Sequence, residues 1–248
     1  MSITEAGVPS REQNGFPQQR QEFYSALFRC DDDTKMYAMQ AYDFSEKAHA
    51  GTKRKYGGGR FFVHPRGVAL TLIRLGETDG DIIAGALLHD TVEDTNAFGE
   101  KNDTFTDTEE RRYAREEIER LGFTARTATV ILALTKPKID GREVTSGRDR
   151  DERYYNQLPQ AIRDDPKIGL IKMADVLYNT TTAKRLRPEK KKRLLLEIQD
   201  HYLPIFAMLF NAPYQIRSMA ILLMSDIGEA MNDLAIRLPM SDALFAAD

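Results

Sequence analysis

Residues 82–94 read IIAGALLHDTVED, an apolar run that ends abruptly in an imidazole and three carboxylates. Residues 82–88 are apolar on almost every side of a helix, and Asp79 stands at a position that suits a helix cap. A helix that is apolar all round belongs in the interior of a protein. The sequence therefore predicts a central helix that carries His89 and Asp90 at its C-terminal end.

The segments on both sides of this helix also show the helical period. From Lys35 onward, apolar side chains recur at spacings of three and four residues, and prolines and glycines stand where helices begin and end. We expect helices at about 35–51, 65–75, 82–89, 113–121, 124–134, 151–163, 167–183, 188–211 with a kink at Pro204, and 214–236. Because no strand alternation of useful length occurs, the predicted fold class is all-α, a helical bundle.

The composition is that of a globular chain with a well-solvated surface. The 248 residues are 42% hydrophobic and 29% charged, and 35 Lys and Arg against 38 Asp and Glu give a formal net charge of −3. No stretch approaches the ~18 uncharged apolar residues of a membrane span, and the charge argues against a protein that coats nucleic acid. Cys30 is the single cysteine, which excludes an intrachain disulfide and a thiolate zinc site.

The chain divides into a short lead-in and one domain. Residues 1–20 carry Gly and Pro among Gln, Glu and Arg, which predicts a flexible lead-in without a signal peptide, and hence a cytoplasmic protein. Residues 21–248 are expected to form a single domain on which the helices within 188–236 pack. The polar segments 96–112 and 136–153 are longer than ordinary connections, and such loops often border a ligand site.

The strongest chemical signal is the sequence HDTVED at residues 89–94. On a helical path Glu93 lies four residues after His89, and Asp94 lies four after Asp90. Like charges at that distance repel unless a cation or a shared proton is present. The apolar helix that leads into them favours a metal site over carboxylates splayed into water, although the second reading stays open.

Two other segments carry weaker signals. His64-Pro65 follows three apolar residues, and taken alone His64 reads as a core histidine bonded to the backbone. Asp175, Asn179 and Thr182 fall at i, i+4 and i+7 on one helix face, which continues an apolar stripe. This polar stripe is a functional candidate, and a buried aspartate satisfied by hydrogen bonds or simply an exposed helix face is an equal alternative.

Taken together these pieces resemble the HD-domain metal phosphohydrolases, and more narrowly the hydrolase domain of the RelA/SpoT-homologue family with its stand-alone small alarmone hydrolases. The resemblance covers about residues 36–210. It is carried by AHAGTKRK at 48–55, His64-Pro65, ALLHDTVEDT at 86–95, LTK at 134–136, IKMADVLYN at 171–179, EKK at 189–191 and HYLP at 201–204.

The resemblance implies a metal site at the centre of an HD-domain bundle. Its four protein ligands would be His64, His89, Asp90 and Asp175, which would hold one divalent ion, Mn²⁺ on this reading. Glu93 and Asp94 would orient the attacking water and accept its proton. His49 and His201 are interpreted as structural.

The resemblance also implies the substrate and the residues that bind it. The expected reaction removes the 3′-pyrophosphate of (p)ppGpp-like alarmones. Arg54 and Lys55 match positions that pack on the base and sugar, Asn179 and Thr182 match positions that contact ribose and phosphates, and Lys136 is a pyrophosphate partner. The basic run 184–193 reads as the polar start of an amphipathic helix, so no nucleic-acid or membrane partner is expected.

The sequence departs from the family pattern at two places near the nucleotide. The loop after Lys55 is one residue longer and lacks the family's proline, and Val176 and Tyr178 replace an Arg and a His. Adenine alarmones, another HD-type nucleotide phosphohydrolase and a non-catalytic alarmone-binding module therefore remain alternatives. The apolar residues of the last two helices fit either a homodimer or an intrachain pair.

Overall fold

The computed structural model describes residues 16–54, 59–99, 106–137 and 148–236, and these residues form a bundle of helices. Within the described ranges the extended structure is limited to an isolated antiparallel bridge between Lys53 and Arg60. The predicted all-α fold is confirmed. Lys55 and the tip of its loop, the lead-in up to residue 15 and much of the 136–153 segment lie outside the described residues.

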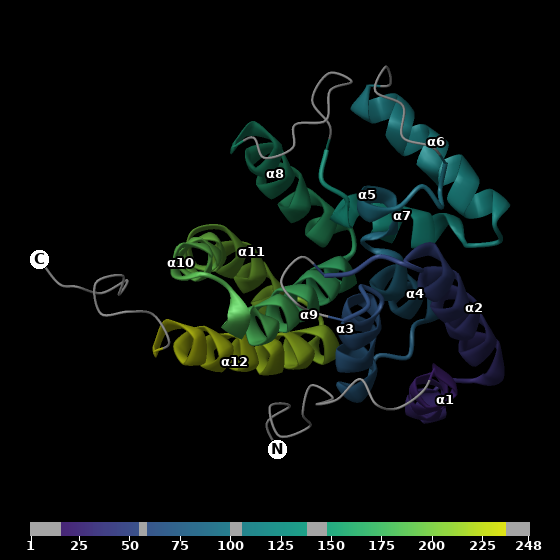
Figure 1. The fold of residues 1–248 in the computed structure, drawn as a ribbon, viewed down its shortest axis with the longest axis horizontal. Helices are drawn as coiled ribbons and strands as arrows, with labels where there is room; N and C mark the ends of the chain where they lie inside the picture. Colours follow the sequence, from purple (N-terminus) through teal and green to yellow (C-terminus); the bar gives the residue numbers. More distant parts are fainter. Residues whose placement is uncertain (1–15, 55–58, 100–105, 138–147, 237–248) are drawn as a thin grey trace, which may run out of the picture.

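Helical elements follow one another along the whole described chain (Figure 1). They are α1 (Phe16–Ala26), η2 (Leu27–Arg29), α2 (Asp32–Ala48), α3 (Val63–Arg74), α4 (Gly80–Leu88), α5 (Thr91–Asp94), α6 (Asp107–Arg120), α7 (Ala125–Leu134), α8 (Arg148–Asp164), α9 (Pro166–Thr182), η3 (Ala183–Arg185), α10 (Pro188–Glu197), the π-helical turn η4 (Ile198–Tyr202), α11 (Leu203–Phe206), η5 (Ala207–Asn211) and α12 (Tyr214–Ile236).

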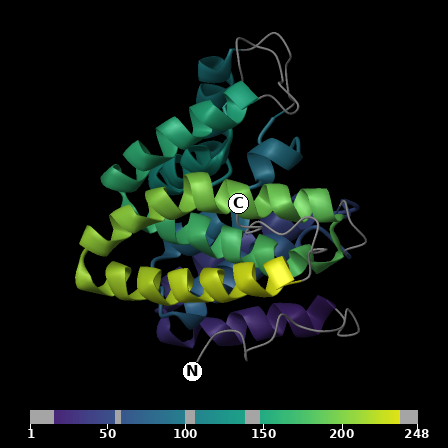
Figure 2. The same ribbon diagram turned by 90° about the vertical axis from the view of Figure 1, so that its left-hand side faces the viewer.

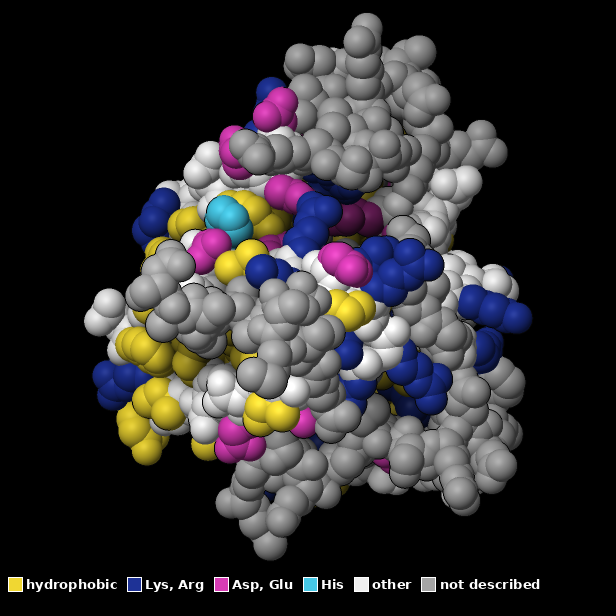
Figure 3. Space-filling model, turned by 60° about the vertical axis from the view of Figure 1, so that its left-hand side comes forward, with side chains coloured by type: hydrophobic (Ala, Val, Ile, Leu, Met, Phe, Trp, Pro, Cys, Tyr) yellow, Lys and Arg dark blue, Asp and Glu magenta, His cyan; other side chains and the backbone are white. Residues whose placement is uncertain are grey.

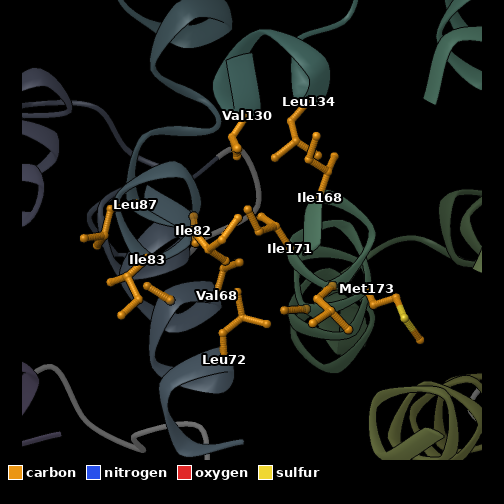
Figure 4. Packing of buried hydrophobic residues seen from close by; sticks show 14 of the residues in the cluster. Val68, Leu72, Ile82, Ile83, Leu87, Val130, Leu134, Ile168, Ile171 and Met173 are labelled. Atoms are coloured by element: carbon orange, nitrogen blue, oxygen red, sulfur yellow. The ribbon is translucent and has the colours of Figure 1, made fainter. Parts of the chain in front are cut away.

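Helix α4 lies in the core, as its all-round apolar sequence predicts. It packs against α2, α3, α7 and α9, and its residues 82–88 are buried. Figure 4 shows its side chains meeting those of the neighbouring helices. At Gly85 a Cβ atom would lie 2.4 Å from a methyl carbon of Val130, so glycine is required for the close contact between α4 and α7. This packing fixes the C-terminal end of α4, where His89 and Asp90 follow.

Helix α9 runs through the middle of the molecule (Figure 1). It begins with Asp165 as a side-chain cap and Pro166 in the first turn, both preferred at helix starts. It packs against α3, α4, α7 and α8 on the core side, and α12 lies along it. Figure 2 shows α12 on the outside of the molecule beside the segment from α10 to η5. The arrangement brings the middle of α9 to the C-terminal end of α4.

The largest differences between the structure and the sequence-based helix boundaries lie in three places. Helix α1 begins at Phe16, inside the segment assigned to the lead-in, and is anchored by Phe23, whose fully buried ring lies 4.9 Å from that of Tyr42. Helix α6 begins at Asp107 rather than near 113, and Thr106 with Glu109 form a capping box that the sequence already displays. The predicted helix at 188–211 is divided by η4.

The division lies where Pro204 predicts a kink. Proline has no backbone N–H, and its ring clashes with the carbonyl group four residues earlier, here that of Asp200. The helix accommodates this clash by widening into a π-turn over Ile198–Tyr202 directly before the proline. The widened turn changes the direction in which Tyr202 points relative to a regular α-helix.

Candidate active site

Four side chains that are distant in sequence meet at the C-terminal end of α4. His64 comes from the first turn of α3, His89 and Asp90 follow α4, and Asp175 lies within α9. The Nε2 atom of His64 lies 3.2 Å from Asp90 Oδ2 and 3.2 Å from Asp175 Oδ1. The Nε2 atom of His89 lies 3.1 Å from Asp90 Oδ1 and 3.8 Å from Asp175 Oδ1. The structure thus brings together all four predicted metal ligands.

His89 has the arrangement typical of a metal-binding histidine. Its Nδ1 atom lies 2.8 Å from the carbonyl oxygen of Ala86, to which the neutral ring donates a hydrogen bond. Its Nε2 atom is buried and lies 3.1 Å from Asp90 Oδ1, and among the described residues no contact of this atom has the geometry of a hydrogen bond. When the backbone fixes the proton on Nδ1, the lone pair of Nε2 faces the ligand site. This nitrogen and a donor set of imidazoles and carboxylates fit a divalent cation.

The charges of this cluster favour a bound cation. Burial by itself lowers the pKa of His89, but the carboxylates of Asp90 and Asp175 outweigh burial and raise the pKa to about 9. Burial opposes ionisation of Asp90, yet His89 and His64 hold its pKa well below the usual value. Against the same effect of burial, Lys172 and the histidines lower the pKa of Asp175. The two carboxylates are therefore anionic, and without a metal a proton on His89 balances part of their charge.

Metal binding is expected to release protons. His89 is protonated below pH about 9 in the metal-free protein, whereas a metal requires the neutral imidazole. As the pH falls below about 9, the apparent affinity for Mn²⁺ should weaken by about tenfold per pH unit, and about one proton should leave per ion bound near pH 7.5. Titration calorimetry in two buffers of different ionisation enthalpy measures this number. Metal binding that is independent of pH between 7 and 9 would contradict the assignment of His89.

The one-turn helix α5 places the two predicted catalytic carboxylates beside the cluster. Glu93 is partly buried, and its Oε1 atom accepts a hydrogen bond of 2.5 Å from the backbone N–H of Lys136. Its Oε2 atom lies 3.3 Å from a guanidinium nitrogen of Arg150, in the first turn of α8. Asp94 is exposed on the same turn. Glu93 is thus fixed in orientation from two sides, one turn after Asp90.

Arg54 lies against α9 and contacts side chains near the C-terminal end of that helix. It donates to Asn179 Oδ1 at 2.9 Å and to Thr182 Oγ1 at 3.2 Å, and its guanidinium lies 5.4 Å from the ring centroid of Tyr178. The Tyr178 ring packs so closely on α3 that a Cβ atom at Gly67 would lie 2.1 Å from it. Asn179 also donates to Asp175 Oδ1 at 2.7 Å. The predicted nucleotide-binding residues Arg54, Asn179 and Thr182 are therefore adjacent to one another and to the metal cluster.

The other predicted residues lie as follows. Lys136 directs its backbone N–H to Glu93, while its ammonium group lies 2.6 Å from Asp151 Oδ1. His49 is buried against the Phe61 ring at 4.8 Å, and burial lowers its pKa to about 4. His201 is exposed and stacks on Tyr155 at 4.1 Å.

On the side that carries α8 and α10, basic and acidic side chains are gathered near the middle of the surface (Figure 3).

Sequence reasoning missed Arg150 and Lys172 and treated Tyr178 as the loss of a family residue. Arg150 contacts Glu93 from α8, and Lys172 contacts Asp175 at 2.9 Å. The position of Lys172 three residues before Asp175 was a usable signal, because i and i+3 are neighbours on a helix. No comparable signal marks Arg150, which reaches Glu93 across 57 residues of sequence.

Comparison with known proteins agrees with the geometry. The family model described as HD domain matches residues 41–209, more than half of the chain and the region that contains all four clustered side chains. The chain belongs to the HD-domain family. An HD domain implies a divalent metal, and His64, His89 and Asp90, whose ligand atoms all lie within 4.8 Å of one another, could hold such an ion.

The curated relatives are consistent with the RelA/SpoT resemblance. The chain is 33% identical over 167 residues to the guanosine-3′,5′-bis(diphosphate) 3′-pyrophosphohydrolase of Aquifex aeolicus, a match that covers 67% of this chain and 20% of the relative. It is 29% identical over 204 residues to the GTP pyrophosphokinase rsh of Brucella ovis, covering 82% of this chain and 23% of the relative. This HD domain is therefore of the RelA/SpoT type, and the chain spans about a fifth of the length of these relatives.

Proposed function

We propose that this protein is a Mn²⁺-dependent pyrophosphohydrolase that removes the 3′-pyrophosphate of (p)ppGpp-like alarmones and releases pyrophosphate with GDP or GTP. The observation that supports this most strongly is the cluster of two histidines and two aspartates with Glu93 fixed beside it. This arrangement combines a cation site with an oriented carboxylate, as metal-assisted hydrolysis of a phosphate bond requires.

In this proposal each side chain has a defined task. His64, His89, Asp90 and Asp175 hold the ion, which when bound would polarise the scissile phosphorus and lower the pKa of water. Glu93, with Asp94 beside it, orients the attacking water and accepts its proton. Water adds to the phosphorus attached to the 3′ oxygen, the P–O3′ bond breaks, and the 3′ oxygen leaves as a hydroxyl group after it takes up a proton.

Substrate binding is assigned to the cluster around Arg54. The planar guanidinium, already held by Asn179 and Thr182, would stack on the base, and Lys55 would pack beside it. Asn179 and Thr182 would contact ribose and phosphates, and Lys136 would exchange Asp151 for the pyrophosphate.

Replacing Arg54 with alanine is expected to raise KM about tenfold to a hundredfold, because a charged hydrogen-bonding group and a stacking surface are lost. The turnover number should change less, since Arg54 lies away from Glu93 in the proposed pose. Arg54→Lys should restore little, because an ammonium group cannot stack in the same way. Steady-state kinetics on the three proteins measures this, and an unchanged KM for Arg54→Ala would contradict the role.

Replacing Arg150 with alanine is expected to lower kcat about tenfold while KM and Mn²⁺ affinity stay within about twofold. The reason is that Glu93 loses its contact with Arg150, while the contacts of the proposed metal ligands stay in place. Arg150→Lys should recover part of the loss. A change in Mn²⁺ affinity without a change in kcat would contradict this role of Arg150.

The substrate class is tested by a product assay on metal-stripped protein that is resupplied with Mn²⁺. ppGpp, ppApp, ATP, dGTP and cyclic dinucleotides are offered in parallel. We expect release of pyrophosphate from ppGpp. Cleavage of ppApp but not of ppGpp would show that the substrate is an adenine alarmone. Turnover of the other nucleotides alone would overturn the alarmone assignment, and tight ppGpp binding without turnover would replace the enzyme with a binding module.

We also propose that this protein is cytoplasmic and acts on a small nucleotide. We propose in addition that it forms a homodimer. None of the helices in the described ranges has the length and apolar content of a membrane span. On the outer face of α12, Ile221 and Leu222 are about half exposed and offer an apolar contact surface. Light scattering coupled to size exclusion measures the assembly, and a monomer at all concentrations would contradict the dimer.

A further inference from the structure

We propose that Lys172 is a positioning residue of the metal centre, which holds one oxygen of Asp175 so that the carboxylate presents its other oxygen to the ion. The inference rests on the metal site in the proposed function. It concerns the binding of the cation, and it does not depend on the identity of the substrate.

The two oxygens of Asp175 have different surroundings. Oδ1 accepts a hydrogen bond of 2.7 Å from Asn179 and lies 3.2 Å from Nε2 of His64 and 3.8 Å from Nε2 of His89, so it belongs to the ligand cluster. Oδ2 lies 2.9 Å from the ammonium group of Lys172. A carboxylate whose second oxygen is held by a cation binds a metal through one oxygen, in a fixed orientation. The aspartate is buried, so this pairing also avoids an unsatisfied charge in the interior.

The ammonium group of Lys172 is itself held in place. It lies 5.3 Å from the ring centroid of Tyr154 in α8 and 5.0 Å from that of Tyr202 in η4, and its side chain is only 13% exposed. Both rings are buried, and aromatic faces attract cations at these distances. A lysine on a helix surface normally extends its charge into water. Here the side chain is retained between two rings and directed at a metal ligand.

The direction in which the Tyr202 ring points depends on the π-turn. In a regular α-helix each residue advances by about 100° around the axis. A π-turn contains more residues per turn, so the residues after it point in other directions than they would in a regular helix. Tyr202 is the last residue of η4, directly before the segment that contains Pro204. The π-turn, whose Ile198 and Tyr202 are buried in the core, therefore also places the Tyr202 ring beside Lys172.

A second explanation makes the opposite prediction. If Lys172 were merely a positive charge near the site, its removal would reduce repulsion and tighten the binding of a divalent cation. If it positions Asp175, its removal leaves Oδ2 unpaired and must weaken cation binding. The sign of the change in Mn²⁺ affinity therefore distinguishes the two.

The experiment is a titration of the metal-stripped full chain with Mn²⁺, with free Mn²⁺ followed by electron paramagnetic resonance. Lys172→Met should weaken binding about tenfold to a hundredfold, the range typical of residues that support a metal ligand. Lys172→Arg, which can still pair with Oδ2, should recover most of this loss. The matched control is Lys167→Met, which removes another ammonium group of α9, one that lies 2.8 Å from Glu77 Oε1 instead of a proposed metal ligand. Its Mn²⁺ affinity should stay within about twofold of the original.

Folding is checked on each variant by circular dichroism and thermal melting without metal. If Lys172→Met does not fold, the pair Tyr202→Leu and Tyr202→Phe decides, because leucine removes the ring and phenylalanine keeps it. Weaker Mn²⁺ binding by the leucine variant alone supports the proposal, and equal binding by both overturns it. Unchanged or tighter binding by a folded Lys172→Met also overturns it. A chain that shows the expected changes but cleaves no alarmone would refute the proposed function and leave this inference intact.

Discussion

Replacing Glu93 with glutamine is expected to lower kcat by about a hundredfold to ten-thousandfold while Mn²⁺ binding stays unchanged. General-base catalysis contributes a factor of this size, and an amide cannot take the proton from the attacking water. Glutamine preserves the shape of the side chain, and its oxygen can still accept the hydrogen bond from Lys136 that is seen for Glu93. The metal ligands are not altered, so the loss should appear in turnover alone.

The measurement combines steady-state kinetics with the Mn²⁺ titration on the same preparation. Glu116→Gln is the matched control, because Glu116 is exposed on α6 and lies 3.7 Å from Arg112 away from the cluster. Its kinetics should equal those of the original protein. A Glu93→Gln variant with full activity would show that another group accepts the proton.

Replacing Asp90 with asparagine is expected to abolish both metal binding and activity. Asp90 contacts both histidines and, in the proposed site, would supply one of the two negative charges that balance the ion. Loss of a residue that supports a metal ligand weakens metal binding by about 10–100-fold. Loss of an anionic ligand itself should weaken Mn²⁺ binding by more than this. The pKa of His89 should also fall toward its ordinary value, because Asp90 is the strongest of the interactions that raise it.

This change is measured by metal content after dialysis, by Mn²⁺ titration and by turnover at high added metal. Asp43→Asn serves as the control, since Asp43 is about half exposed and pairs with Arg20 on the surface. A stoichiometric ion bound to Asp90→Asn with the original affinity would remove Asp90 from the ligand set.

The sequence predicts the centre of the fold better than its periphery. The apolar run at 82–88 and the i, i+4, i+7 spacing of Asp175, Asn179 and Thr182 are local patterns, and they reappear as the core helix and as the polar stripe beside the site. Helix α1 is different, since its polar composition is overridden by the burial of Phe23 against a helix that starts at residue 32. A tertiary contact of this kind has no signature in the local sequence.

The same distinction applies to the site. The pairing of His64 with Asp90 and Asp175 follows from no spacing, and it was expected from the family resemblance alone. Lys172 could have been placed near Asp175 from helix periodicity, but the two rings that enclose it come from α8 and η4. Arg150 could not have been paired with Glu93 at all, because the contact depends on how α8 packs against α7 and α9.

In the proposed function, this chain breaks the bond between the 3′ oxygen and phosphorus with the help of a bound cation. The most direct test incubates metal-stripped protein with ppGpp in ¹⁸O-labelled water, with and without Mn²⁺, and analyses both products by mass spectrometry. We predict equal amounts of GDP and pyrophosphate, with the label in pyrophosphate, and only when Mn²⁺ is present. Release of orthophosphate, label in the nucleoside, or equal turnover without metal would refute this reaction.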